Sequence, residues 1–264
     1  MTKIVITLIL MSLLLFSLLR NDNKFKINFL DIGQGDAILI TTPDNQNILI
    51  DGGPDNLLLS ELAKAMDWWE RDIDYLIISH YHADHMVGFI ELLNRYRVKN
   101  VLVTGHQPED FLYRVWTDKL SEKNIIPTIV YAGDKFILSD DLSWQVLSAD
   151  TNHEDYNENS LVMRLTYKDT DFMLTGDLGE EGEARILQAG FDISSEYLKV
   201  GHHGSRWSSS QKFLEAISPQ FCIIQSGKDN KFGHPHQETI DRLNSIGCQI
   251  MDNQNLGIIS FKFD

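Results

Sequence analysis

The sequence is poor in cysteine and proline, with 2 and 6 residues of these types among 264. Two cysteines cannot build the dense disulfide framework of small secreted domains. Cys222 and Cys248 both lie in apolar runs, so we expect buried free thiols, or one disulfide if the domain is exported. Hydrophobic residues make up 43% of the chain and charged residues 23%, as in ordinary globular proteins, which excludes a disordered or collagen-like chain.

Basic residues are scarce as well. The chain holds 23 Lys and Arg against 38 Asp and Glu, which gives a formal net charge of −15. The electrostatic field of such a chain repels a polyanion and argues against nonspecific binding of duplex DNA over a broad surface. It does not exclude a substrate phosphate that is held by a metal ion or by a local basic patch.

One long uncharged apolar run occurs, at the N-terminus. It extends from Ile4 to Leu19, follows Lys3 and ends at Arg20. This pattern is typical of a signal peptide, although the run is slightly short of the roughly 17–25 residues of a membrane-spanning helix. No clear cleavage site follows, so we expect residues 1–24 to be either a cleaved signal peptide or a membrane anchor. The remainder is then expected to act outside the cytoplasm, secreted or anchored by this segment.

Residues 25–264 contain no flexible linker, repeat or low-complexity tract, and we expect a single domain there. Apolar runs between turn residues predict strands at 26–33, 36–42, 47–53, 75–79, 100–103, 125–130, 136–138, 144–148, 160–167, 171–175, 197–200, 221–225, 249–251 and 257–262. Helical periodicity is found at 57–70, 84–96, 109–122, 179–190, 211–217 and 235–246. Two strand-rich halves interleaved with helices predict an α/β fold of two sheets packed face to face, with helices outside.

The strongest chemical signal is a cluster of histidines and an aspartate at 80–85, directly after an apolar strand. His80 and His82 point the same way in an extended loop and can bind one ion. Asp84 and His85 open the next helix and can reach a neighbouring ion. Imidazole and carboxylate together are ligands that zinc and manganese prefer. A solvated, histidine-rich loop is the alternative, but it does not account for the position at a strand end.

The His-x-His-x-Asp-His pattern resembles that of the metallo-β-lactamase superfamily. Three further segments resemble superfamily motifs in the same order, namely 48–53, 174–177 and 199–205. The resemblance implies a four-layer αβ/βα sandwich of the metallo-β-lactamase type. It also implies that Asp177 bridges the metal ions. The alternative for Asp177 is a cap of the helix that begins near residue 179.

More narrowly, the chain resembles the extracytoplasmic hydrolase domain of the ComEC family of DNA-uptake proteins. The segments that carry this resemblance are 30–37, 159–162, 175–177, 202–205 with 208–210, and 233–236. The multi-span channel of full-length ComEC proteins is missing here, so we expect a stand-alone relative. The superfamily usually has another metal-binding histidine before the Thr-Gly-Asp motif at 175–177. At that place this chain has Asn157, Glu158 and Asn159, with His153 nearby.

These observations predict one or two divalent ions, Zn²⁺ or Mn²⁺, that activate a water molecule for hydrolysis. The predicted metal ligands are His80, His82, Asp84, His85, Asp177 and His202. The resemblance implies that Asp84 also orients the attacking water. His234 or His236 would suit as proton donor to the leaving group, unless both lie in a solvated turn. Of His202 and His203, one is expected to be a ligand and the other a substrate contact or a hydrogen-bond donor to a ligand. His202 is placed with the ligands and His203 with the substrate contacts, and the sequence leaves the reverse open.

The predicted substrate contacts are His203, Ser205, Ser208 and Asn159. The serines precede a helix, where hydroxyls and backbone amides can hold an anion, or they can be plain helix caps. Basic residues gather in this region, which predicts a local positive rim; they are Lys199, Arg206, Lys212, Lys228 and Lys231. The segment 33–36 is predicted to be a turn near the metal loop. Trp68 and Trp69 are expected to pack on the first helix.

Three functions remain open. The first is a metal-dependent phosphodiesterase or nuclease, whose partner is a phosphoester substrate such as single-stranded nucleic acid. The second is an exported small-ester hydrolase, such as a phosphocholine esterase. The third is a surface binding module in which the metal is structural. Structural zinc sites are usually closed and cysteine-rich, so an open His/Asp cluster favours an enzyme. The sequence leaves the oligomeric state open.

Overall fold

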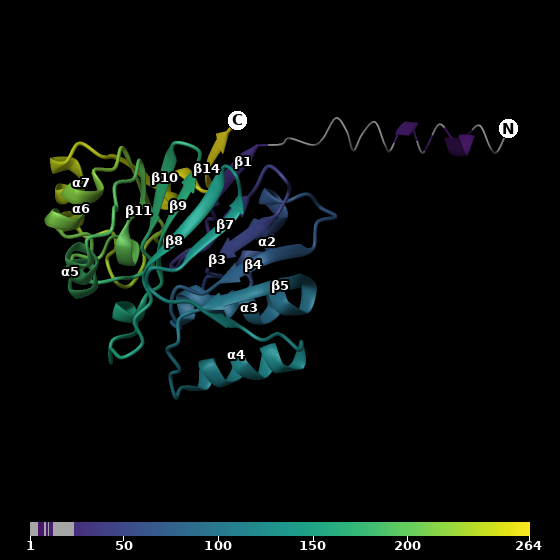
Figure 1. The fold of residues 1–264 in the computed structure, drawn as a ribbon, viewed down its shortest axis with the longest axis horizontal. Helices are drawn as coiled ribbons and strands as arrows, with labels where there is room; N and C mark the ends of the chain where they lie inside the picture. Colours follow the sequence, from purple (N-terminus) through teal and green to yellow (C-terminus); the bar gives the residue numbers. More distant parts are fainter. Residues whose placement is uncertain (1–4, 8, 10, 13–23) are drawn as a thin grey trace.

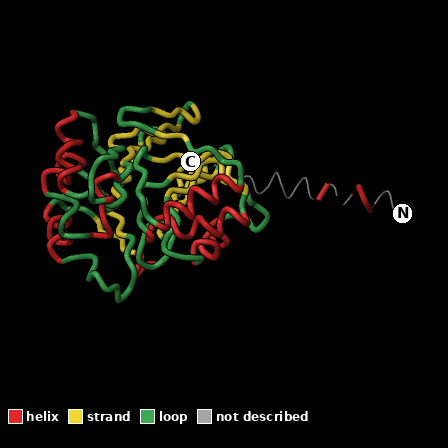
Figure 2. Tube along the Cα trace, turned by 90° about the horizontal axis from the view of Figure 1, so that it is seen from below, coloured by secondary structure: helices red, strands yellow, loops and turns green. Residues whose placement is uncertain are grey.

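The fold is a four-layer sandwich of two β-sheets with helices on both outer faces (Figure 1). The computed structural model describes residues 5–7, 9, 11–12 and 24–264. Figure 2 shows the strands in the middle of the molecule and helices along its two flanks. The α/β architecture expected from the sequence is therefore confirmed.

Each sheet has seven strands. The first sheet has the order β14 (Ile259–Phe263), β1 (Phe25–Phe29), β2 (Ile38–Thr41), β3 (Asn47–Ile50), β4 (Asp72–Ile77), β5 (Arg97–Val103) and β6 (Thr128–Ile129). The second has the order β13 (Gln249–Asp252), β12 (Phe221–Ile224), β11 (Tyr197–Lys199), β10 (Thr170–Leu174), β9 (Val162–Tyr167), β8 (Leu142–Ser148) and β7 (Lys135–Ser139). Strands β3 to β6 are parallel to one another, and so are β10 to β13.

The helices divide between the two outer layers (Figure 1). Those beside the first sheet are α2 (Leu57–Ala65), α3 (Ala83–Arg95) and α4 (Phe111–Glu122). Those beside the second sheet are α5 (Glu180–Ala189), α6 (Gln211–Ile217) and α7 (Gln237–Ser245). Short elements complete the fold: α8 (Asn253–Leu256) and the 3₁₀ turns η1 (Tyr156–Asn159) and η2 (Gly201–Gly204).

Alternating side chains hold these layers together. In β2, Ile38 and Ile40 point into the core between the sheets, whereas Leu39 points to the helices of the first sheet. The alternation follows from the two-residue period of a strand. Because helices cover both outer faces, the central strands are apolar on both sides, as parallel sheets require. In α3, Phe89 and Leu92 are the apolar face that packs on the first sheet.

The predicted elements differ from the structure mainly at their ends. The helix expected at 57–70 ends at Ala65, because Met66 is already extended and the Glu70 carboxylate accepts hydrogen bonds from the Arg71 and Asp72 amides. The strand expected at 125–130 is only two residues long. The predicted N-terminal segment lies mostly outside the described residues. Among the residues that are described, no helix is long and apolar enough to cross a membrane.

The two cysteines form a disulfide between Cys222 in β12 and Cys248, directly before β13. Of the two possibilities that the sequence left open, the structure therefore has the single disulfide and not the two free thiols. Both cysteines are buried in the core between the second sheet and its helices. The bridge joins residues that are 26 apart in sequence, which restricts the unfolded chain more than the folded one.

Replacing both cysteines, as Cys222→Ala with Cys248→Ala, is expected to lower the free energy of unfolding by about 3.5 kcal/mol, the chain-entropy value for a loop of this length. Urea unfolding followed by circular dichroism measures the change. The parent protein in excess reductant should lose a similar amount. An unchanged midpoint in both experiments would mean that the bridge does not constrain the unfolded chain.

Candidate metal centre

The candidate centre lies where parallel strands of both sheets end. Strand β4 leads into the loop that carries His80 and His82, and the first turn of α3 carries Asp84 and His85. From the second sheet, Asp177 follows β10. These residues are up to 97 positions apart in sequence, and the packing of the two sheets brings them together.

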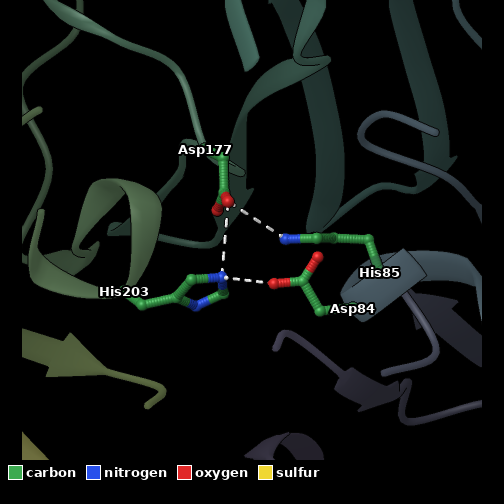
Figure 3. Close-up of side chains that lie close together, drawn as sticks. All are labelled: Asp84, His85, Asp177 and His203. Carbon is green, nitrogen blue, oxygen red and sulfur yellow. Dashed lines mark ion pairs between the residues drawn. The ribbon is translucent and has the colours of Figure 1, made fainter. Parts of the chain in front are cut away.

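Four side chains form the middle of this cluster (Figure 3). Asp84, His85, Asp177 and His203 each offer one ligand atom, and these atoms lie within 4.8 Å of one another. The Nε2 atoms of His85 and His203 lie 3.2 and 3.3 Å from the same oxygen, Asp177 Oδ2. His203 Nε2 is also 3.4 Å from Asp84 Oδ2. The arrangement directs two imidazoles and two carboxylates at one point.

The other predicted ligands surround this group. His80 Nε2 lies 4.0 Å and His202 Nε2 lies 3.8 Å from Asp177 Oδ2. His80 Nε2 is 3.0 Å from His82 Nδ1, so these two rings are neighbours. All six predicted ligands thus gather at the ends of the strands. Their individual roles stay predictions.

The donor set fits a divalent cation. Several buried atoms of the described residues have no hydrogen-bond partner, and three of them lie together in this group: Nε2 of His85, Nε2 of His203 and Oδ1 of Asp177. Buried polar atoms are nearly always paired, so three unpaired atoms at one point indicate a ligand site. Imidazole nitrogen and carboxylate oxygen are also the donors that Zn²⁺ and Mn²⁺ accept.

The pKa values of the central groups indicate the same need for positive charge. Burial alone would raise the pKa of Asp177, but neighbouring imidazoles, His203 foremost, hold it well below its usual range. Burial alone would lower the pKa of His85 and His203, but nearby carboxylates, Asp177 foremost, hold the pKa of both rings well above the usual range. Without a cation, protons on these two rings supply the charge that the carboxylates attract.

His80 and His82 behave differently. Burial lowers the pKa of both rings, and for His80 the charge of His85 lowers it further. Rings with a lowered pKa are neutral at pH 7 and keep a lone pair for a metal ion. These two histidines therefore suit the ligand role without first losing a proton.

Asp51, at the end of β3, holds the histidine loop in place. Its carboxylate accepts hydrogen bonds from the Ser79 amide at 2.8 Å and from Ser79 Oγ at 2.6 Å. The same carboxylate lies 2.9 Å from His85 Nδ1, which turns His85 Nε2 toward Asp177. Partners of this kind fix the orientation of a ligating imidazole. The sequence analysis placed this strand but did not assign this role to Asp51.

Asp36 is a charged neighbour of His203, whose Nδ1 is hydrogen-bonded to the Gln225 carbonyl oxygen at 2.8 Å. The Oδ1 atom of Asp36 lies 3.2 Å from His203 Nδ1, and its Oδ2 atom lies 2.6 Å from Lys199 Nζ. Lys199 is only 1% exposed, so it is not part of a positive rim, and the predicted rim loses one of its five members. The turn that carries Asp36 lies against the metal loop as expected, because a Cβ at Gly35 would come 2.1 Å from the Asp84 carbonyl oxygen.

His202 and His203 lie in η2, both with positive φ angles, 48° and 55°. Such backbone costs non-glycine residues on the order of 1–3 kcal/mol each and is concentrated at functional sites. The side chain of His203 is 1% exposed and its Nδ1 lies 2.8 Å from the Gln225 carbonyl oxygen, whereas the side chain of His202 is 28% exposed. The geometry therefore places His203 in the central group and His202 at the exposed edge of the cluster, the opposite of the predicted placement.

Three predicted substrate contacts are buried. Ser208 is fully buried and Ser205 nearly so, and the Thr239 hydroxyl donates to the Ser205 carbonyl oxygen at 2.8 Å. Asn159 is buried too, and its side-chain amide donates to the His153 carbonyl oxygen at 2.9 Å and accepts from the His153 amide at 3.1 Å. These side chains hold the loops in place, and their predicted contact with a substrate stays a prediction.

The N-terminus of α6 is already occupied by a protein carboxylate. Glu183 of α5 accepts hydrogen bonds from the amides of Ser209 and Ser210, the second at 2.8 Å. These amides are therefore not available to hold a substrate anion. Asp177 does not cap α5 either, since the N-cap position of α5 is Gly179. The structure thus leaves Asp177 to the metal centre.

His234 and His236, the predicted proton donors, lie beside the cluster. The ring centre of His234 is 5.5 Å from that of His202 and 4.8 Å from that of His236. Burial, followed by the neighbouring histidine charges, lowers the pKa of His234 to about 4, so this ring is neutral at pH 7. Nδ1 of His236 accepts a hydrogen bond from the Arg206 amide at 3.1 Å. Proton donation by either ring stays a prediction.

An acidic hollow of about 600 Å³ lies next to the centre. Its lining combines one indole with polar and acidic side chains: Asn152, His153, Glu154, Asp155, Glu158, Glu180, Glu181 and Trp207. Asp155 is close enough to His82 for its charge to act on the pKa of that ring. His153 therefore lines this hollow and is not among the four central ligands.

Comparisons with known proteins agree with this geometry. The model of the metallo-beta-lactamase superfamily matches residues 30–220. ComE operon protein 3 of Bacillus subtilis (strain 168) is 27% identical over 90% of this chain and 33% of its own length. Competence protein ComA of Neisseria gonorrhoeae is 25% identical over 91% of this chain and 32% of its own length. The chain thus spans about a third of these relatives.

A solved structure with a similar fold is that of Igni18, described as a novel metallo hydrolase from the archaeon Ignicoccus hospitalis KIN4/I. It superimposes with a TM-score of 0.62 at 14% sequence identity, and the match covers 90% of this chain and 100% of that chain. At this identity the match supports the fold. Together with the family model and the two relatives, it confirms the resemblance that the motifs indicated.

Replacing His203 is expected to weaken metal binding more than replacing His202. His203→Ala removes one of the four central ligands, whereas His202→Ala removes a ring at the edge of the cluster. Titration of the metal-stripped protein with Zn²⁺ in a calorimeter should give a dissociation constant at least roughly tenfold higher for His203→Ala, the loss reported even for outer-shell partners. Equal losses in the two variants would contradict the assignment.

Lys199→Met is expected to lower the free energy of unfolding by about 3–5 kcal/mol, because it removes the ammonium group whose Nζ lies 2.6 Å from the buried carboxylate of Asp36. Urea unfolding gives the value. Lys212→Met, at an exposed position of α6, is the matched control and should change stability by at most about 0.5 kcal/mol. A loss in the control as large as in Lys199→Met would show that the effect is not specific to the buried pair.

Proposed function

The chain belongs to the metallo-beta-lactamase superfamily, and from that premise we propose that it is a metal-dependent phosphodiesterase that cleaves single-stranded nucleic acid. The observation that carries the proposal is the convergence of Asp84, His85, Asp177 and His203 within 4.8 Å, with three of their atoms unpaired. The resemblance of the motifs to the ComEC family of DNA-uptake proteins supports nucleic acid as the substrate class, and the similarity to ComE operon protein 3 and competence protein ComA agrees with that resemblance.

When bound at this centre, one or two divalent ions supply Lewis acidity and lower the pKa of water toward about 7. The predicted ligands would hold the ions, and Asp51 and the Gln225 carbonyl oxygen keep His85 and His203 turned toward Asp177. Asp84 is partly exposed, and although burial acts to raise its pKa, the neighbouring His203 and His85 rings keep that pKa below the usual range. It is therefore ionised and can accept a hydrogen bond from the attacking water.

A second candidate is a small phosphoester with a cationic group, such as a phosphocholine ester. The acidic hollow favours it, because carboxylates such as Glu154 and Glu181 attract a quaternary ammonium and the indole of Trp207 can stack on it. The same hollow repels a polyanion, so a nucleic-acid strand would have to pass on the other side of the centre. In both cases the metal centre acts on a phosphoester.

The two candidates are separated by substrate. We expect the full chain with Mn²⁺ or Zn²⁺ to cleave a single-stranded oligonucleotide faster than the same sequence as a duplex, since the net charge of −15 disfavours broad duplex contact. A chelator should abolish cleavage, and added metal should restore it. Asp177→Asn should lose more than roughly 100-fold in rate, and Asp118→Asn, on the exposed face of α4, should lose nothing.

The chromogenic ester p-nitrophenyl phosphocholine tests the second candidate. If it is the better substrate, Trp207→Ala should slow its hydrolysis and leave any cleavage of the oligonucleotide unchanged. Metal binding without cleavage of either compound would contradict both candidates and favour a binding module.

A further inference from the structure

Two neighbouring tryptophans are exposed at a turn. Trp68 is 75% and Trp69 is 45% exposed, and their rings meet edge to face with centres 5.5 Å apart. The sequence predicted that both pack on the first helix, but α2 ends at Ala65 and the turn after it leaves both indoles exposed. Large apolar surfaces of this kind usually mark a contact surface.

The turn lies at the end of the first sheet that is farthest from the metal centre. Strand β4 begins at Asp72, just after the tryptophans, and ends at Ile77, just before the histidine loop. Six extended residues span about 20 Å. A partner that covers the tryptophans would therefore leave the entrance to the centre open.

The chain also enters the fold at this end. Strand β1 begins at Phe25, and a hollow of about 440 Å³ is lined by Lys26 of that strand together with Met66 and Glu70 of the tryptophan turn. The apolar run that ends at Leu19 precedes this strand in the sequence. Residues 20–24 between them can span at most roughly 18 Å. Anything that holds the apolar run is thus kept close to the tryptophans.

Charges around the turn are balanced. The basic residues Lys26, Lys64 and Arg71 are matched by three acidic ones, Glu61, Asp67 and Glu70. The surface therefore does not select an anionic partner by charge. What distinguishes it is a pair of indoles, and tryptophan is the side chain that is enriched at the boundary between lipid and water.

We propose that this end of the molecule rests on the surface of a phospholipid bilayer, with Trp68 and Trp69 at the level of the headgroups. The proposal rests on the expectation that the N-terminal apolar run enters the same bilayer, and it is independent of the reaction that the metal centre performs. In this orientation the carboxyl ends of the strands, with the metal centre, face away from the membrane.

The test uses the full chain in phosphatidylcholine vesicles, with part of the lipid brominated on the acyl carbons nearest the headgroup. Bromine quenches the fluorescence of an indole that touches it. We expect the fraction quenched by bromine to fall roughly twofold or more in the Trp68→Phe, Trp69→Phe variant, since these are the indoles placed in the boundary. Trp207→Phe is the matched control, because Trp207 is 71% exposed but lies near the metal centre, and its loss should not lower the quenched fraction.

Other occupants of the surface give different results. Indoles that are shielded from aqueous iodide but not quenched by bromine would be covered by protein, either the N-terminal segment or a second copy, and this would overturn the proposal. Quenching that persists in the double variant would overturn it as well. Replacing part of the phosphatidylcholine by phosphatidylglycerol should leave quenching unchanged, and a severalfold rise would contradict a contact made by indoles rather than by charge.

Discussion

The rest of the structure depends on negative charge that is buried in one place. Four carboxylates, Asp36, Asp51, Asp84 and Asp177, lie in or around the cluster, and Lys199 is the one lysine paired with any of them in the described residues. Leaving a carboxylate buried without a partner costs several kcal/mol. The centre must therefore hold positive charge, as protons on imidazoles or as metal ions. The same positive charge stabilises the buried carboxylates in the fold and forms the candidate metal site.

The two sheets meet this requirement by bringing strand ends together. Asp51 follows β3, the histidine loop follows β4, and Asp177 and His203 follow β10 and β11. Each is held at a turn, and Asp51, His202 and His203 adopt positive φ angles that the surrounding hydrogen bonds maintain. Strain of this kind persists only where packing determines the backbone, so the rigid layers behind the site are what allow the ligands to stay in place.

The sequence predicts those parts of the site whose residues are close together in the chain. The spacing of His80, His82, Asp84 and His85 gives chemistry and position together, and the alternation of the strands gives the layers. The sequence does not predict features that depend on distant residues. The burial of Lys199 against Asp36 joins positions 163 residues apart in sequence, so a count of basic residues placed Lys199 on a rim. The capping of α6 by Glu183 and the exposure of Trp68 likewise depend on packing and on where a helix stops.

The pairing of β14 with β1 has a consequence for how this domain can be connected. Phe25 lies opposite Phe263, and Lys24 Nζ is 2.6 Å from a carboxylate oxygen of Asp264, so the start of β1 and the end of β14 are neighbours. Adjacent termini are the geometry that tolerates circular permutation and insertion into a longer polypeptide. A short linker from the end of β14 to the start of β1 would leave every strand in register. A tag or tether attached at either of these ends would project from the end of the domain that lies opposite the histidine loop.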